Sequence, residues 1–221
     1  VYEQSQTETA ADLWKALQEG LIIPIAEVYK FFQNSESVEV AQTSDFSVPY
    51  KFLHDRVQQA AYFLIPESQK QLTHLKIGQL LLSNTPEAEI EEKIFDLVNQ
   101  LNRGTELITH QTEKDELTKL NLIAGRKAKA STAYAAALRY LTVGLEILPA
   151  SSWQTQYELT LALYNEAAEV AFLNGNFQQM QELADTVIKQ AKTLLNKVKV
   201  YKVKIQACMA LNQQLEAVNI A

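Results

Sequence analysis

Residues 125–149 read GRKAKASTAYAAALRYLTVGLEILP, and this stretch decides the fold. Apolar side chains recur every three or four residues over 133–148, which predicts an amphipathic helix that ends before Pro149. Another helix is expected over 117–129, only a few residues upstream. Because short links between long amphipathic helices favour antiparallel neighbours, the stretch predicts a helical hairpin.

The same pattern continues toward the carboxyl terminus, with helices expected over 153–174, 177–192 and 198–211. The expected turn positions Thr132, Gly175 and Asn212 lie 43 and 37 residues apart, rather than the ~34 residues of a strict tetratricopeptide repeat. Small, aromatic and proline positions nevertheless have the relative spacing of such a repeat: Gly125, Tyr134, Ala137, Leu141 and Pro149 in one copy, and Ala168, Gly175, Phe177 and Ala184 in the next. We therefore predict tetratricopeptide-like antiparallel hairpins with longer helices, forming a right-handed α-solenoid. Small residues would let paired helices approach closely, and Gly175 with Asn176 would form a tight reversal and cap the next helix.

The amino-terminal region has a different pattern. A short helix is expected over 9–19, ended by Gly20 as a left-handed cap. Strands are expected over 21–25 and 48–53, with the polar stretch 33–47 as a wing between them. This helix, strand, wing, strand order predicts a small winged-helix-like module with one two-stranded ribbon, in a chain that is otherwise mostly α-helical.

Three further helices are expected between these regions. Val57, Ala60, Ala61 and Leu64 form the stripe of the first, which Pro66 ends or redirects. The second contains Leu72 to Leu81, and the third follows Thr85-Pro86, a cap-plus-proline start. We predict a winged-helix-like domain with its following helix over 1–84 and a helical repeat domain over 85–221.

Composition and charge exclude several classes of protein. The chain has 221 residues, of which 47% are hydrophobic, so it can bury a sizeable core. It has no apolar run long enough to cross a membrane and no signal peptide, so a cytoplasmic location is expected. Cys208 is the single cysteine, and the three histidines are too scattered for a metal site. Residues 1–105 carry 15 acidic and 8 basic residues, which argues against nucleic acid as a partner.

Residues 50–62, YKFLHDRVQQAAY, carry the most specific local motif. The hydrophobic-His-Asp sequence Leu53-His54-Asp55 at a helix start resembles the winged-helix module of STAND-type signalling ATPases. The resemblance implies that His54 closes over the phosphates of ADP bound to an ATPase core and holds the resting state. The chain has no phosphate-binding loop, so it would supply only one wall of that pocket. Arg56 is a second candidate phosphate contact.

Each candidate residue also has a structural interpretation. His54 could bond only a backbone group or Asp55, and Arg56 could be solvated or paired with a carboxylate. The lysine run 189–204, which has no acidic residue from Thr186 to Leu215, is interpreted as a solvated helix face in preference to a site for nucleic acid or an acidic peptide. No arrangement of nucleophile, base and acid can be argued from spacing, so the chain itself is not expected to be an enzyme.

A wider resemblance involves His74-Leu75-x-Ile77-Gly78, residues 123–128 and Tyr140-Leu141 together with the His-Asp motif. This combination resembles the region that follows the AAA-type ATPase in large cyanobacterial hybrid Ser/Thr-kinase and histidine-kinase signalling proteins. It implies a non-catalytic region that couples nucleotide state and ligand or partner sensing to kinase output. The chain would be a piece of a larger polypeptide, with its neighbouring ATPase and kinase domains as partners and a protein or peptide as a possible partner of the repeats. ATP or ADP would be bound by the parent protein, with no cofactor in the chain itself.

Two other classes remain open. The winged helix could belong to a DNA-binding STAND-type transcription regulator, although the acidic amino-terminal half argues against that function. Alternatively, the repeats could form a stand-alone peptide-binding scaffold, which a concave groove lined by exposed Tyr and Asn side chains would favour.

Overall fold

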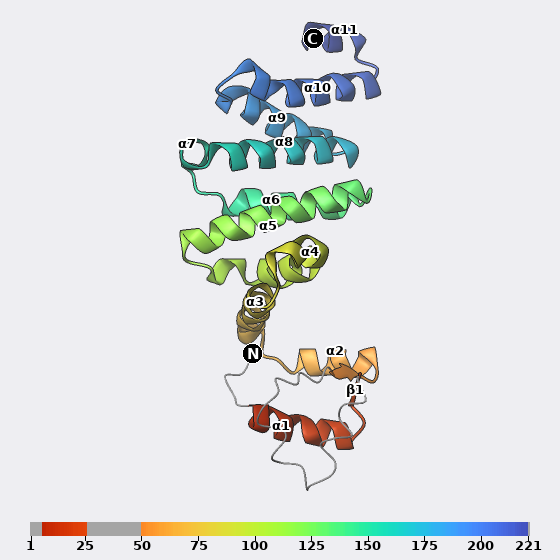
Figure 1. Cartoon of the computed structure of the whole chain (residues 1–221). Helices are drawn as coiled ribbons and strands as arrows, with labels where there is room; N and C mark the ends of the chain where they lie inside the picture. Colours follow the sequence, from red (N-terminus) through yellow and green to blue (C-terminus); the bar gives the residue numbers. More distant parts are fainter. Residues whose placement is uncertain (1–5, 26–49, 221) are drawn as a thin grey trace. The chain divides into compact units, whose positions relative to one another are not determined.

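The computed structural model describes residues 6–25 and 50–220, which form two compact units, Val1–Lys70 and Gln71–Ala221. The division between the two units falls after Lys70, inside one helix. The domain boundary predicted after residue 84 stays a prediction. In the described residues the chain is mostly helical with a small two-stranded antiparallel sheet (Figure 1), as the sequence predicts.

The first unit contains the predicted helix and ribbon. Helix α1 (Gln6–Gln18) ends at Gly20, whose φ of +68° gives the left-handed cap that the sequence predicts. Strand β1 (Ile22–Pro24) pairs antiparallel with β2 (Tyr50–Phe52), with Ile22 opposite Phe52. Each strand ends one residue earlier than predicted, at Pro24 and at Phe52. The expected wing over 33–47 and the first two residues of the second predicted strand lie outside the described residues. Helix α2 (Asp55–Phe63) follows β2 directly.

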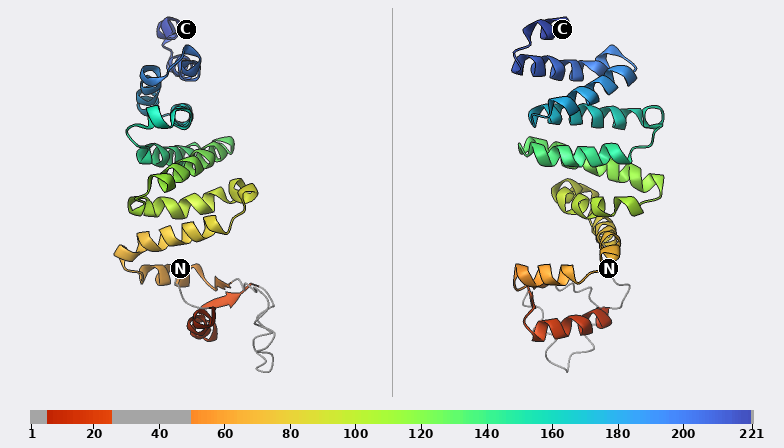
Figure 2. Two further views of the ribbon diagram at one scale, coloured as in Figure 1. Left: turned by 60° about the vertical axis from the view of Figure 1, so that its left-hand side comes forward. Right: turned by 180° about the vertical axis from the view of Figure 1, so that it is seen from behind.

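The second unit is a succession of helices. It begins within α3 (Glu67–Ser83) and continues as α4 (Glu87–Leu101), the 3₁₀ helix η3 (Asn102–Leu107), α5 (Gln111–Ala130), α6 (Tyr134–Ile147), α7 (Ser152–Thr155), α8 (Tyr157–Leu173), α9 (Phe177–Gln190), α10 (Leu194–Ala210) and α11 (Gln214–Ile220). Helix α5 packs against α6, α8 against α9, and α10 against α11, while α8 also contacts α5, α6 and α10. Figure 2 shows the helices from α4 to α11 stacked in successive layers.

The three predicted turn positions share one conformation. Thr132, Gly175 and Asn212 have φ values of 59°, 76° and 62°. At each of them the backbone N–H bonds the carbonyl three residues earlier, and the next N–H bonds the carbonyl five residues earlier, at 2.8–3.2 Å. This pair of bonds is the Schellman motif that ends a helix. At the second turn, Asn176 Oδ1 also accepts a hydrogen bond from Gln179 N, so its predicted cap is confirmed.

Several helix boundaries differ from the predictions; the helix predicted over 117–129, for example, begins earlier, at Gln111. The single helix predicted over 153–174 is divided into α7 and α8, because Gln156 has φ −138° and ψ 46°, outside the helical region. The helix predicted over 198–211 begins earlier, at Leu194, since the Thr193 side chain caps it by accepting a hydrogen bond from Asn196 N.

Glycines allow close contact between helices, and Gly125 and Gly78 are two examples. A Cβ on Gly125 of α5 would lie 2.6 Å from Cγ and Cδ2 of the fully buried Leu141 in α6. A Cβ on Gly78 of α3 would lie 2.6 Å from Leu101 Cδ2 in α4. The Gly125 contact confirms the predicted role of a small residue in the α5–α6 hairpin, and both contacts leave no room for a larger side chain.

Two apolar clusters form the core of the second unit. One is centred on α3, α4 and α5 and includes Ile94, Val98 and Leu117. The other extends from α5 to α10 and includes Leu141, Leu163 and Val187. Because each cluster is shared by successive helices, no helix pair buries its apolar face alone.

Candidate functional site

His54 and Arg56, the residues predicted from the sequence, lie at the start of α2. The His54 backbone is extended, with φ −137° and ψ 143°, and its carbonyl accepts the first hydrogen bond of the helix from Val57 N at 2.9 Å. Both side chains are exposed, and that of His54 makes no capping bond. The geometry leaves both side chains accessible, but contact with a nucleotide phosphate stays a prediction.

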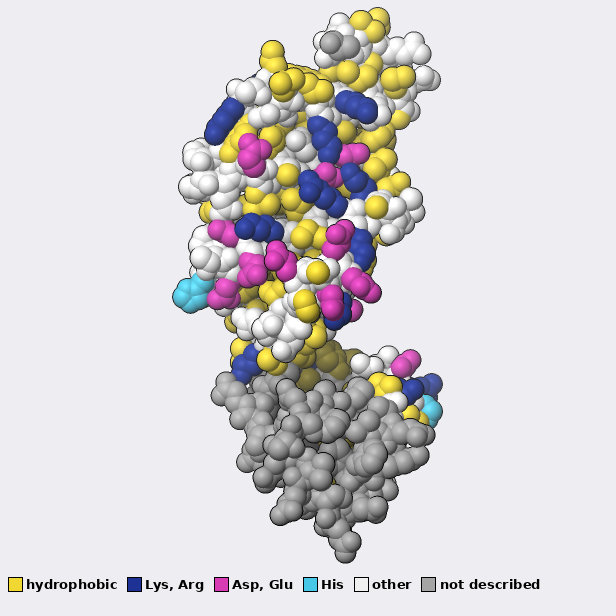
Figure 3. Space-filling view, in the orientation of Figure 1, with side chains coloured by type: hydrophobic (Ala, Val, Ile, Leu, Met, Phe, Trp, Pro, Cys, Tyr) yellow, Lys and Arg dark blue, Asp and Glu magenta, His cyan; other side chains and the backbone are white. Residues whose placement is uncertain are grey.

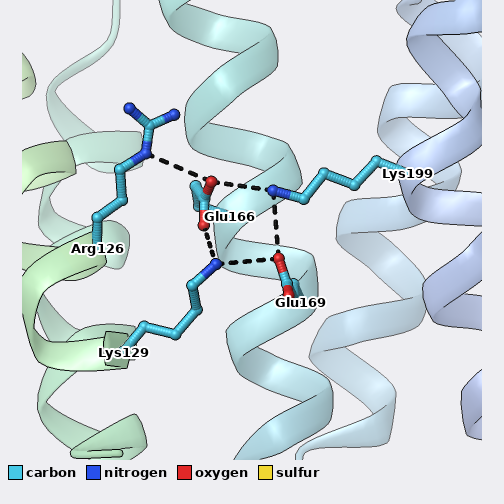
Figure 4. Close-up of polar contacts among 5 residues, drawn as sticks. All are labelled: Arg126, Lys129, Glu166, Glu169 and Lys199. Carbon is cyan, nitrogen blue, oxygen red and sulfur yellow. Dashed lines mark hydrogen bonds and ion pairs between the residues drawn. The ribbon is translucent and has the colours of Figure 1, made fainter. Parts of the chain in front are cut away.

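A charged network joins three helices of the second unit (Figure 4). Arg126 and Lys129 of α5, Glu166 and Glu169 of α8, and Lys199 of α10 lie together. Within α5 and within α8, the two residues are three positions apart and therefore share a helix face. Three successive helix pairs therefore contribute to the network, each through its first helix: two residues from α5, two from α8 and one from α10.

Glu166 is the centre of this network. Its Oε2 accepts a hydrogen bond from Lys129 Nζ at 2.5 Å, and its Oε1 accepts one from Lys199 Nζ at 2.9 Å and a longer one from Arg126 Nε at 3.4 Å. The same two lysines approach Glu169 Oε2 at 3.1 and 3.2 Å. The two carboxylates and two ammonium groups thus form a closed ring of ion pairs.

Burial and charge act on Glu166 in opposite directions. Only 8% of its side chain is exposed, and this burial by itself would raise the pKa of the carboxyl group. Hydrogen bonds and charge from Lys129 and Lys199 outweigh the burial, so the pKa of Glu166 is lowered. Burial would likewise lower the pKa of Lys129, but bonds to Glu166 and Glu169 raise it. The lowered pKa of Glu166 and the raised pKa of Lys129 both favour the charged forms of these two groups at neutral pH.

This arrangement is suited to coupling helices and ill suited to acid-base catalysis. A general base needs a pKa near the working pH, whereas the cations hold Glu166 in its ionised form. A carboxylate placed between α5 and α10 instead resists separation of three consecutive helix pairs, because separation would leave a buried charge without a partner. Three cations and two carboxylates also leave one positive charge in excess. Arg126 is half exposed, and Figure 4 shows its terminal guanidinium nitrogens directed away from the ring.

The charge pattern along the chain does not predict this network. Lys199 and Lys204 were expected on a solvated face, but Lys199 bonds Glu166 and Lys204 Nζ lies 2.8 Å from Asp185 Oδ1. For these two lysines the interpretation was wrong, because it counted nearby charges only along the chain. A signal was present in α8, an apolar helix in which Glu166 and Glu169 share one face and must find partners if buried.

Two tyrosine hydroxyl groups are bonded to residues outside their own helices. Tyr157 Oη accepts hydrogen bonds from Lys192 N at 2.9 Å and from Asn196 Nδ2 at 2.6 Å. Tyr140 Oη donates to Asn99 Oδ1 at 3.0 Å. These hydroxyl groups fix contacts between helices, so they do not favour an open groove of free Tyr and Asn side chains.

The described ranges 6–25 and 50–220 contain no helix that is both long and apolar enough to cross a membrane. No group of three or more His, Cys, Asp or Glu side chains in the same ranges is placed to hold a metal ion.

Comparison with known proteins gives one informative similarity. The chain is 31% identical over 169 residues to the hybrid signal transduction histidine kinase G of Dictyostelium discoideum. The alignment covers 66% of this chain but only 5% of that protein, so the chain corresponds to a small part of a much longer signalling protein. No protein-family model and no solved structure matches the chain significantly. The similarity indicates a region related to signalling proteins.

Proposed function

We propose that the chain is a non-catalytic regulatory and protein-interaction region of a multidomain signalling protein. The observation that carries this proposal is the similarity to a short part of a hybrid histidine kinase. A match restricted to 5% of that protein fits a module working beside other domains better than a self-sufficient one. The partners proposed are the neighbouring ATPase and kinase domains of one cytoplasmic polypeptide.

The two units would have different parts in this function. The order α1, β1, β2, α2 supports a winged-helix-like module, whose His54 and Arg56 would contact ADP phosphates when an ATPase core is present. Helix pairs with repeated Schellman turns support a tetratricopeptide-like, right-handed solenoid for the second unit. In this proposal the first unit reports the nucleotide state and the second receives a partner or ligand signal.

The ion network gives the second unit a means of transmission. Because Glu166 and Glu169 connect α8 to both α5 and α10, movement of one helix pair changes the ion pairs of the next. Coupling of this kind requires a contiguous element that two sites can bias. The network therefore links the regions on either side of α8.

The test uses a full-length protein that carries this chain. Histidine autophosphorylation is measured for wild type and for Glu166→Lys, which replaces the central carboxylate by a third amine beside Lys129 and Lys199. An allosteric connection typically changes an equilibrium by at least about fivefold, so a change of that size in kinase output is expected. The matched control is Glu158→Lys, the same charge change at an exposed position of the same helix.

The control should stay within about twofold of wild type, since isolated surface charges contribute little. Equal outputs from wild type and both variants would contradict a role for the second unit in kinase regulation. The isolated chain should also show no ATP hydrolysis, because it lacks a phosphate-binding loop. Hydrolysis that survives repurification and depends on His54 would show instead that the chain is itself an enzyme.

A further inference from the structure

An open apolar pocket of about 610 Å³ lies between α3, α4 and the start of α5, wholly within residues 71–221. Its floor is made by Leu75, Leu101, Ile108, Leu117 and Leu120, each at most 7% exposed. Leu82 and Ile90 extend the apolar wall toward the opening. This volume is within the range of pockets that accept ligands or anchoring side chains.

The rim of this pocket is acidic. Glu87 of α4 and Glu113 and Glu116 of α5 line it, together with the polar residues Gln79, Ser83 and Thr85. No Lys, Arg or His is among its lining residues. Glu113 Oε2 accepts a weak hydrogen bond from Gln79 Nε2 at 3.5 Å, so that carboxylate is directed across the gap between α3 and α5.

The surroundings of the rim reinforce its negative potential. Residues 87–116 contain nine acidic and three basic residues. Figure 3 shows acidic side chains gathered on one face over α4 and α5, with basic side chains over α8 to α10. A cleft lined by charges of one sign attracts the opposite charge and repels polyanions such as nucleic acid.

We propose that this pocket docks a basic amphipathic helical segment of a partner protein. Leucine-like side chains at i, i+3 or i+4, and i+7 would enter the pocket, as in other helix-in-groove interactions. Lysine or arginine side chains flanking them would pair with Glu87, Glu113 and Glu116. The inference rests on the proposed function only in assigning the second unit to protein interaction, and it adds the place and the chemistry of the partner.

The test is a titration of the chain with a defined probe, followed by fluorescence anisotropy. The probe is a labelled 14-residue peptide with Leu at positions 1, 4, 5, 8, 11 and 12 and Lys elsewhere. A peptide with the same leucines and Glu in place of Lys tests the charge requirement, and a scrambled peptide of equal composition tests the helical spacing.

Two protein variants with equal net charge locate the binding. The double variant Glu113→Lys/Glu116→Lys reverses two rim charges. It should raise the dissociation constant of the Lys peptide at least about fivefold, since exposed ion pairs contribute up to about 1 kcal/mol each. The control variant Glu91→Lys/Glu92→Lys changes two exposed α4 glutamates that do not line the pocket. It should raise the dissociation constant by less than half the factor seen for the rim variant. A third variant, Leu82→Asp, places a charge in the apolar wall and should abolish binding. Circular dichroism establishes that each variant is folded.

Several outcomes would overturn the proposal. They are equal binding of the Lys and Glu peptides, equal binding of the scrambled peptide, and equal loss in both double variants. Self-association that is removed by Glu113→Lys/Glu116→Lys, without peptide binding, would assign the pocket to a second copy of the chain. Failure of these assays would leave the kinase-output test of the connector role unaffected, because that test depends on Glu166.

Discussion

Replacing Glu166 by Gln removes the central charge of the ion network while nearly conserving the volume of the side chain. A hydrogen bond to a charged group contributes about 1.5–3 kcal/mol. In this variant both lysines keep Glu169 as a partner. Lys199 is also 40% exposed, so water can replace its lost bond. The net loss of stability is therefore close to the contribution of the single short bond from Lys129. We expect Glu166→Gln to lower the free energy of unfolding by about 2 kcal/mol.

Thermal unfolding followed by circular dichroism measures this loss. For a chain of this size each kcal/mol lowers Tm by about 2–4 °C, so a decrease of about 4–8 °C is expected. The matched control is Glu169→Gln, whose side chain is 32% exposed and whose loss leaves Glu166 in place. That variant should cost less than about 1 kcal/mol.

The dependence on pH supplies an independent check. The folded-state pKa of Glu166 is lowered from its ordinary value of 4.5, so its contribution is fully present above that value and is lost as the pH falls through the folded pKa. The raised pKa of Lys129 means that its contribution is present below 10.5 and is lost as the pH rises through a higher value. The difference between wild type and Glu166→Gln should therefore be constant between about pH 5 and 9 and should shrink in acid.

Two results would refute this reasoning. One is a Tm for Glu166→Gln no lower than that of Glu169→Gln. The other is a difference from wild type that stays unchanged at the lowest pH at which both proteins fold.

Three further predictions follow from the turns, the helix contact and the His-Asp motif. Thr132→Gly should stabilise the chain by about 1 kcal/mol and Gly175→Ala should destabilise it by a similar amount, since both positions need positive φ. Urea unfolding midpoints measure both changes, and midpoints that shift in the same direction would contradict this prediction. Gly125→Ala should cost about 1–2 kcal/mol in the same assay, because the clash with Leu141 exceeds the gain in helix propensity, and a more stable variant would show that the helices can separate freely. His54→Ala should cost the isolated chain at most about 1 kcal/mol of stability. In a full-length parent it should shift the equilibrium away from the resting state by roughly 10- to 150-fold, measured as ADP release. Unchanged release together with a large loss of stability would show that His54 has a structural role.

The helical and turn positions were largely readable from sequence because they depend on neighbours a few residues away. The stripe spacing over 133–148 predicted α6, which the structure places at Tyr134–Ile147. Gly20, Thr132, Gly175 and Asn212 were identified as turn positions, and all four have positive φ. Even Thr132, a poor residue for that conformation, was located by its place in the repeat.

The candidate sites were decided by the tertiary structure. Lys129 and Glu166 are 37 residues apart, and which lysine a carboxylate meets depends on the order and angle of packed helices, which helical periodicity does not specify. The acidic pocket likewise combines side chains from α3, α4 and α5, and Leu101 in its floor lies against Gly78 of α3. Sequence alone therefore determined which stretches are helical and where four of the turns lie, because those choices are local. The tertiary structure determined which charges and apolar faces meet, because burial makes each such contact depend on all the elements around it.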